Sequence, residues 1–500
     1  MDAAPNDDAE ASPPTATTEP TSPGAPSGPA WWAGARPADE LAEAAPAVVD
    51  WAVRYLSEVG ERPVLSEVAP GWVRDQLPAH APEEPEAWDA ILSDLDRVVV
   101  PGTTHWQSPR WFGYFQANSS APAVLAEAII ATLGTQGMLW QTGPACTEVE
   151  TLVMDWLAEL LGLPERFRSD GPGGGVIQDS ASSSTLVATL AARDRARAAG
   201  ARLDDLVAYT SVDAHSSVEK GLRVAGLLAD QLRAVPVDEA RAMRPDALAE
   251  AVAADVAAGR TPFLVVATVG TTSTHGLDPL GPVGEVARAH GAWFHVDAAH
   301  AGAAALLPEL RGVHDGLEAA DSYVMDPHKW LFTAMECSAL FVADAAPLAD
   351  ALSITPEYLR NAATGSGEVV DYRDWQVPLG RRFRALKLWA VIRRFGAEGL
   401  RAAVRGHIAL AADLEARLAA DGRFVLPVPR PLNLVCFGHV AGDDASEVLL
   451  AALNATGRVF CSHTRIDGRY LLRVSVGQTA TGPADLDELW TLVDRLAPPA

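Results

Sequence analysis

The stretch HVDAAHAG, residues 295–302, begins with the last two residues of the short apolar run AWFHV, residues 292–296, and indicates the fold of the surrounding chain. A run of this length after a glycine predicts a buried strand, and it places Asp297 at the carboxyl end, where open α/β sheets bind their ligands. A carboxylate beside Val296 and Ala298 is costly to bury unless a cation meets it. The protonated ring nitrogen of a bound molecule would be such a cation. The ordinary alternative is that Asp297 caps the N-terminus of the next helix.

The chain around this motif alternates between apolar runs and helical periodicity. Besides 292–296, strands are predicted over 206–210, 232–237, 263–269, 322–325 and 339–342. This alternation predicts an α/β fold with a mostly parallel central sheet covered by helices. We expect a disordered Pro/Ala/Ser-rich acidic tail over 1–34, a helical segment over 35–119, a large domain over 120–386 and a small α+β domain over 387–500. Residues 353–373 read as a long surface loop.

The composition excludes several classes of function. The formal net charge is −26, from 65 acidic and 39 basic residues, which argues against binding to nucleic acid or to an anionic membrane surface. No run of about 18 apolar residues predicts a membrane span. The four cysteines lack CxxC spacing, and the N-terminus lacks the pattern of a secretory signal, so we expect no metal site and a cytoplasmic location.

The motif DPHKWLF, residues 326–332, carries one of only three lysines in the chain. Lys329 follows a predicted strand and precedes aromatic and apolar residues, a setting in which a lysine can lose its proton and attack an aldehyde. Its neighbour His328 could orient the product or move a proton. A surface lysine is the alternative, but Lys220 and Lys387 lie in helical surroundings, which leaves Lys329 as the best candidate.

Small and hydroxyl residues run from GGGVIQDSASSS, residues 173–184, into a periodic helix. Free amides and the helix dipole at such an end bind phosphate, and Ser180, Ala181 and Ser182 are small enough to allow close approach. An ordinary N-cap is the alternative. His215 follows a predicted strand and could stack on a flat ring. Thr272 follows another strand and could donate a hydrogen bond.

This ordered series resembles the group II PLP-dependent amino acid decarboxylases, most closely the aromatic-L-amino-acid decarboxylases. The resemblance covers about residues 35–495 and is carried by PGTTHWQSPRWFGYF, GPACTEVETLVMDWL, AHSSVEKG, HVDAAHAG, DPHKWL and DYRDWQVPLGRRFRALKLW. It implies fold type I, the aspartate aminotransferase-like fold, with pyridoxal 5'-phosphate (PLP) as cofactor. It also implies a homodimer in which N-terminal helices wrap the partner and the active site lies at the subunit interface.

The resemblance implies a role for each candidate site residue. Lys329 is expected to hold PLP as a Schiff base, and Asp297 to pair with the pyridine nitrogen. Around the ring, His215 is expected to stack on one face, Ala299 to lie beneath it and Thr272 to lie near it. The phosphate is expected to lie at Ala181, Ser182 and Asp326, and Tyr358 to return a proton to the substrate carbon after CO2 leaves. Trp106, Tyr114, Met138, Leu139 and Gly380 are expected at the substrate pocket, with the segment around Met138 and Leu139 reaching across from the partner.

Three positions depart from the pattern of the animal members. Asp326 replaces an asparagine, and a carboxylate facing a phosphate would repel it. Ala117 replaces a threonine, which removes a hydroxyl on the substrate side. Met138 replaces a phenylalanine, which loosens the pocket.

The predicted activity is decarboxylation of an aromatic L-amino acid to its arylalkylamine and CO2. An aldehyde synthase on the same scaffold and a PLP aminotransferase are the alternatives. The sequence leaves open whether the substrate is tryptophan, phenylalanine, tyrosine or DOPA, although Gly380 resembles the residue of indole-accepting plant relatives.

Overall fold

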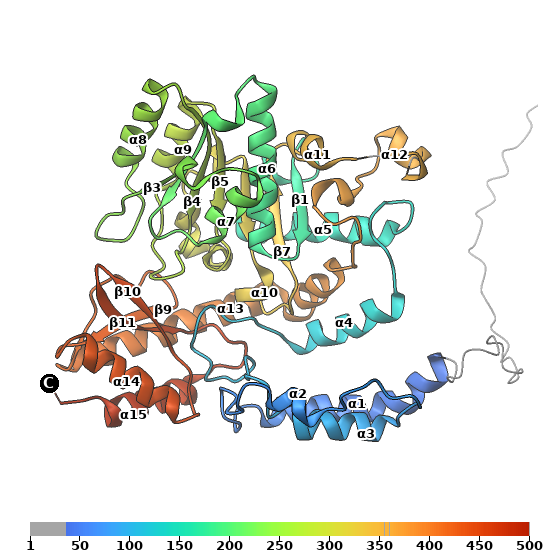
Figure 1. Ribbon diagram of the computed structural model, residues 1–500, viewed down its shortest axis with the longest axis vertical. Helices are drawn as coiled ribbons and strands as arrows, with labels where there is room; N and C mark the ends of the chain where they lie inside the picture. Colours follow the sequence, from blue (N-terminus) through green and yellow to red (C-terminus); the bar gives the residue numbers. More distant parts are fainter. Residues whose placement is uncertain (1–36, 355, 360, 500) are drawn as a thin grey trace, which may run out of the picture.

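A central seven-stranded sheet organises the computed structural model, which describes residues 37–354, 356–359 and 361–499 (Figure 1). The strands are β1 (Gly174–Gln178), β2 (Leu206–Ser211), β3 (Leu232–Val235), β4 (Thr261–Thr268), β5 (Trp293–Asp297), β6 (Ser322–Met325) and β7 (Ser338–Val342). Their order is β1-β7-β6-β5-β4-β2-β3. All six predicted strands are confirmed, whereas the expected N-terminal tail lies outside the described residues.

The sheet is parallel except at one strand. Strands β3, β2, β4, β5 and β6 pair in parallel, and β7 pairs antiparallel with both β6 and β1. Strand β1 was not predicted from the sequence, because its glycines lower the propensity for a strand. A Cβ at Gly173 would lie 2.0 Å from the Arg166 carbonyl oxygen, and one at Gly175 would lie 2.5 Å from Met154. Close packing at this edge therefore requires the glycines.

Helices cover both faces of the sheet. One core joins the sheet to α6 (Ala181–Ala198), α7 (Ser217–Val224) and α11 (Ala346–Leu352). The other core joins it to α5 (Pro144–Leu161), α8 (Pro245–Ala257), α9 (Leu280–Ala289) and α13 (Ala385–Ala420). Short helices connect these elements: η2 (Glu165–Phe167), η3 (Leu203–Asp205), η4 (Ala229–Gln231), η5 (Ala301–Leu306), η6 (Pro308–His314), η7 (Leu317–Ala319) and α10 (Pro327–Trp330).

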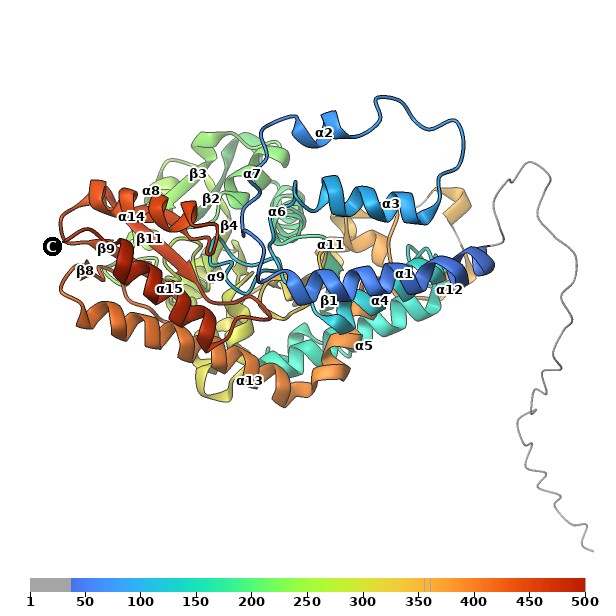
Figure 2. The ribbon, with the colours of Figure 1, turned by 90° about the horizontal axis from the view of Figure 1, so that it is seen from below.

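The two ends of the described chain form separate layers. The N-terminal helices α1 (Pro37–Glu58), α2 (Trp72–Gln76) and α3 (Trp88–Asp94) lie beneath α4 (Ala121–Leu133) and away from the sheet (Figures 1 and 2). A π-helical turn, η1 (Leu95–Val99), follows α3. The C-terminal unit pairs β8 (Phe424–Val425), β9 (Leu434–His439), β10 (Ser462–Ile466) and β11 (Arg469–Ser475) in the order β10-β11-β9-β8, with α14 (Asp443–Ala455) and α15 (Pro483–Leu496) against them.

The segment 353–373 is not a plain loop, because its described part contains η8 (Glu357–Leu359) and α12 (Ala362–Ser366), and η9 (Tyr372–Trp375) begins within it. These short helices were not predicted, because the polar and small residues of the segment give no apolar periodicity. Within the described residues, none of the helices combines the length and the apolar character that crossing a membrane requires.

Candidate active site

A cavity of about 330 Å³ opens where the parallel strands end. Its walls come from the segments that follow β1, β2, β4, β5 and β6, together with the segment before α4. Ten of the predicted residues line it: Tyr114, Ala181, Ser182, His215, Thr272, Asp297, Ala299, Asp326, His328 and Lys329. The tertiary structure thus gathers at one place residues that are spread over more than 200 positions of the chain.

Asp297 is the last residue of β5, and its side chain is almost completely buried. Its Oδ1 accepts a hydrogen bond from the Ala299 N–H at 3.0 Å. Burial raises the pKa of Asp297, and the nearby positive charge of Lys329 opposes that rise. A carboxyl group in this position would be stabilised as a carboxylate by any cation that enters the cavity.

Lys329 and His328 both face Asp326. The Lys329 Nζ lies 2.8 Å from the Asp326 Oδ2, and the His328 Nε2 lies 3.5 Å from the same oxygen. Burial raises the pKa of Asp326, but attraction by Lys329 and His328 outweighs it, so the net pKa is lowered. Asp326 is therefore an ionised group that holds the lysine amine in place.

Hydrogen bonds determine the tautomers of two histidines. The Cys337 N–H donates to the His328 Nδ1 at 3.1 Å, and the Ser217 N–H donates to the His215 Nδ1 at 3.2 Å. Because each Nδ1 accepts, the neutral rings carry their proton on Nε2. Desolvation is the main cause that lowers the pKa of both histidines, so both favour the neutral form.

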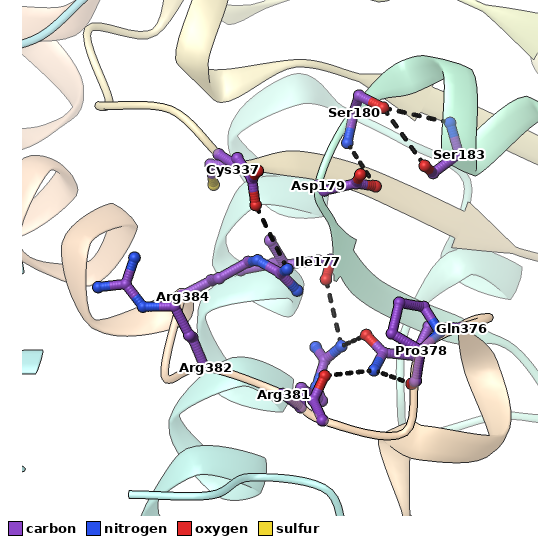
Figure 3. A network of polar contacts seen from close by, with 12 residues as sticks. Ile177, Asp179, Ser180, Ser183, Cys337, Gln376, Pro378, Arg381, Arg382 and Arg384 are labelled. Carbon is purple, nitrogen blue, oxygen red and sulfur yellow. Dashed lines mark hydrogen bonds and ion pairs between the residues drawn. The ribbon is translucent and has the colours of Figure 1, made fainter. Parts of the chain in front are cut away.

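The N-terminus of α6 is the part of the cavity wall suited to an anion. Ser180 caps the helix, with its Oγ accepting from the Ser183 N–H at 3.3 Å (Figure 3). The next amides, of Ala181 and Ser182, occupy the first helical positions, where no intrahelical acceptor exists. The positive end of the helix dipole adds to their attraction for an anion.

A buried ion pair stabilises the junction between β1 and α6. The Arg381 guanidinium pairs with the Glu150 carboxylate and donates to the Gln376 Oε1 at 2.7 Å and to the Ile177 carbonyl at 3.2 Å. The Arg381 main-chain N–H also donates to the Gln136 Oε1 at 2.8 Å. As Figure 3 shows in part, Arg381 ties the end of β1 to the 376–381 turn. This role of Arg381 was not predicted from the sequence.

Four predicted pocket residues do not line the cavity of this chain: Trp106, Met138, Leu139 and Gly380. The Trp106 ring stacks at 4.1 Å on Trp111 instead. Gly380 lies beside the 136–140 segment, since a Cβ built on it would approach only the Gln136 Nε2, at 3.5 Å. The prediction for the Tyr358 side chain lies outside the described residues, because only its backbone, in η8, is described.

Ser180, expected at the helix start beside Ala181 and Ser182, also lines the cavity, together with residues that were not predicted: Phe115, Ser217, Thr268, Gly270 and His300. The His300 ring stacks on Phe115 at 3.9 Å and on Trp330 at 5.0 Å, so it lies within an aromatic column. Its position three residues after Asp297 was the one available signal. The contact with Phe115 is long-range and leaves no local pattern.

Comparison with known proteins assigns the chain and its fold to a family. Residues 70–440 match the pyridoxal-dependent decarboxylase conserved domain. The chain belongs to that family. It is 44% identical to phenylacetaldehyde synthase of Arabidopsis thaliana, over 92% of this chain and 96% of that protein. It is 42% identical to aromatic-L-amino-acid decarboxylase of Mus musculus, over 90% and 96% respectively.

A solved structure supports the same assignment. The crystal structure of Oryza sativa TDC with PLP and tryptamine matches with a TM-score of 0.91 and 40% identity, over 93% of this chain and 99% of that one. The predicted family, the fold class and PLP as cofactor are therefore confirmed. The decarboxylase is a carboxy-lyase.

The residues of the cavity fit PLP. A buried carboxylate at Asp297 suits a protonated pyridine nitrogen, the α6 N-terminus suits a phosphate, and the Lys329 amine suits an aldehyde. All three groups line the same cavity.

Proposed function

We propose that this decarboxylase converts aromatic L-amino acids to arylalkylamines and CO2, with PLP attached to Lys329. The observation that carries the proposal is the convergence of Lys329, Asp297 and the α6 N-terminus on one cavity. The match to an aromatic-L-amino-acid decarboxylase along nearly all of the chain supports the substrate class. When bound, PLP supplies an electron sink for the pair of electrons that CO2 leaves behind.

Each polar group of the cavity has a distinct task in this proposal. The Asp297 carboxylate would keep the pyridine nitrogen of PLP protonated, and the His215 ring and Ala299 would contact the cofactor ring. Thr272 lies near the ring. The Ala181 and Ser182 amides hold the phosphate, which accounts for the lack of bulky side chains at these positions.

Asp326 acts on the lysine rather than on the phosphate. Its 2.8 Å contact with the Lys329 Nζ supports this role. The His328 Nε2 lies 3.5 Å from the same carboxylate, and the His328 main-chain N–H donates to the Cys337 carbonyl at 3.3 Å. The motif DPHK thus orients the amine.

We further propose a homodimer with the active site at the subunit interface. Helices α1 and α4 expose apolar side chains, among them Leu41, Val53, Leu125, Ile129 and Leu133, each more than half exposed. Large exposed apolar faces of this kind are typical of obligate interfaces. Met138 and Gly380, which miss the cavity of their own chain, would then reach the partner's cavity, whereas Leu139 is buried within its own chain. Light scattering should give twice the chain mass, and Leu125→Asp should lower it.

The same scaffold supports a second candidate, an aromatic aldehyde synthase. The 44% identity to phenylacetaldehyde synthase favours it. Tyr358 and His215 favour the decarboxylase, because synthases that resemble this family usually replace one of them. A PLP aminotransferase is a third possibility.

One experiment separates these activities. The purified holoenzyme is incubated with a panel of aromatic L-amino acids, and the products are identified by mass spectrometry. Amine with CO2 supports the decarboxylase, aldehyde with peroxide supports the synthase, and a keto acid supports the aminotransferase. Borohydride reduction followed by peptide mapping should place the cofactor on Lys329; an adduct on Lys220 or Lys387 would overturn that assignment.

A cytoplasmic location is the last part of the proposal. All four cysteines, Cys146, Cys337, Cys436 and Cys461, are free and buried, as expected of a protein that works in a reducing compartment. Fractionation of the source cells with an antibody to the chain tests this, and recovery in an exported fraction would contradict it.

A further inference from the structure

The short helix that carries the cofactor lysine receives two of its hydrogen bonds from a single residue outside it. The Asn118 main-chain N–H donates to the His328 carbonyl at 2.9 Å, and the Asn118 Nδ2 donates to the Lys329 carbonyl. Helix α10 spans only Pro327–Trp330 and cannot satisfy its last carbonyl groups internally. A helix of one turn also has little stability of its own. Asn118 therefore caps the element on which Lys329 stands.

The same side chain is fixed from the opposite direction. The Asn118 Nδ2 donates to the Gly477 carbonyl at 2.7 Å, and the Oδ1 accepts from the Thr479 N–H at 2.8 Å and from the Thr479 Oγ1 at 2.9 Å. Asn118 is 2% exposed. Both amide hydrogens and both oxygen lone pairs are thus used, which allows one orientation of the group.

Asn118 joins three parts of the molecule that are distant in sequence. It belongs to the segment before α4, it contacts the lysine-bearing turn, and it contacts the 477–479 loop that follows β11. Ser120 continues the same line of contacts, with its Oγ donating to the Phe332 carbonyl at 2.7 Å. The main chain on both sides of Lys329 is held by this segment.

The position of the main chain matters because the lysine amine is linked to it by four rotatable methylene groups. The Asp326 carboxylate attracts the amine, but the reach of Nζ into the cavity is set by where the Lys329 Cα lies. Misplacement by even one ångström lowers the effective concentration of a reacting group strongly. We propose that Asn118 is a positioning residue, which holds the Lys329 main chain so that the amine meets the cofactor aldehyde. The inference rests on the proposed role of Lys329.

Gln116 provides a matched control. It lies two residues away and is also fully buried, and its Nε2 donates to the Ser475 carbonyl at 2.7 Å and to the Trp111 carbonyl at 3.1 Å. It therefore joins the same segment to the same C-terminal unit. Its side-chain bonds do not involve α10, so Gln116→Ala removes an equivalent tie without touching the lysine-bearing turn.

The experiment compares Asn118→Ala and Gln116→Ala as full-length holoenzymes and as apoenzymes freed of PLP. Three quantities are measured: the dissociation constant for PLP, the rate at which the absorbance of lysine-bound cofactor appears after PLP is added, and the Tm. We expect Asn118→Ala to raise the dissociation constant about 10-fold and to slow the appearance of the absorbance, because buried carbonyl groups lose their donor. Gln116→Ala should lower the Tm similarly and leave both PLP quantities within about twofold.

A second variant keeps the test decisive if Asn118→Ala does not fold. Thr479→Val removes one hydrogen bond that orients the Asn118 amide, and it should shift the same two PLP quantities in the same direction, to a smaller extent. Wild-type PLP affinity and rate in a folded Asn118 variant, or equal losses in Gln116→Ala, would overturn the proposal. Peptide mapping of the borohydride adduct tests Lys329 separately, so a failure there is distinguishable.

Discussion

Acidification should destabilise the folded chain through buried histidines, and His275 offers the clearest case. Its side chain is fully buried, and neither ring nitrogen has a hydrogen-bond partner in the described part of the chain. Burial, aided by the positive charge of Arg473, lowers the pKa of His275 to about 3 from the usual 6.5. Below pH 6.5 the unfolded chain binds a proton that the folded chain rejects, so stability is lost as the pH falls.

The size of the effect follows from the difference between the two pKa values. Between pH 6.5 and pH 5 the unfolded state binds a proton at His275 that the folded state does not bind. Over these 1.5 pH units the free energy of unfolding falls by about 2 kcal/mol, at 1.36 kcal/mol per unit. Burial lowers the pKa of His295 to about 3 and that of His314 and His407 to about 4, which adds to the loss. Burial raises the pKa of Asp278 to about 7, which acts in the opposite direction.

A variant isolates the contribution of His275 from these other groups. His275→Asn removes the titrating ring and keeps a residue that tolerates the φ of +63° at this position. Urea unfolding is measured for both proteins between pH 7.5 and pH 5. The variant starts less stable because it leaves a cavity, but its loss of unfolding free energy on acidification should be about 2 kcal/mol smaller than that of the wild type.

His463→Asn, at an exposed histidine, controls for the removal of a histidine as such. If the unfolding free energies of His275→Asn and the wild type fall in parallel with pH, His275 does not contribute to acid sensitivity and the reasoning is refuted.

Three substitutions test the proposed chemistry. Asp297→Asn removes the carboxylate while keeping its shape, so PLP binding should weaken about 10- to 100-fold, as for a lost hydrogen bond to a charged group; unchanged affinity measured by fluorescence titration would contradict the pairing with the ring nitrogen. Tyr358→Phe should keep PLP binding but lose most amine production, with aldehyde becoming detectable by mass spectrometry, and unchanged amine turnover would remove Tyr358 from the mechanism. Gly380→Ser should lower kcat/KM for tryptophan about 10- to 200-fold more than for tyrosine, the scale of one methylene-sized group; equal losses for both substrates would end the claim for specificity.

Several elements were predictable because their signals are local. The strand ending at Asp297 and the strand before Asp326 are short apolar runs, and a buried β-strand requires such a run. The scarcity of lysine singled out Lys329. In contrast, β1 was missed, because close packing against Met154 at this edge requires glycines that weaken the local strand pattern.

Other site residues could not be predicted because their contacts are long-range. Asn118 meets Lys329 across 211 positions and Gly477 across 359, and no periodicity relates these residues. Arg381 meets Glu150 across 231 positions. Because each of these buried side chains is far from its partner in the sequence, only the folded chain shows which group accepts its hydrogen bonds.

By itself, the sequence determined the α/β class and placed the carboxylate of Asp297 and the amine of Lys329 after predicted strands, because burial and the ends of strands leave local patterns in the order of residues. The tertiary structure alone decided that Asp326 pairs with the lysine, that Asn118 holds the lysine main chain, and that Met138 and Gly380 lie away from the cavity of their own chain. The physical reason is that hydrogen bonds and ion pairs act over about 3 Å in space, whatever the distance along the chain.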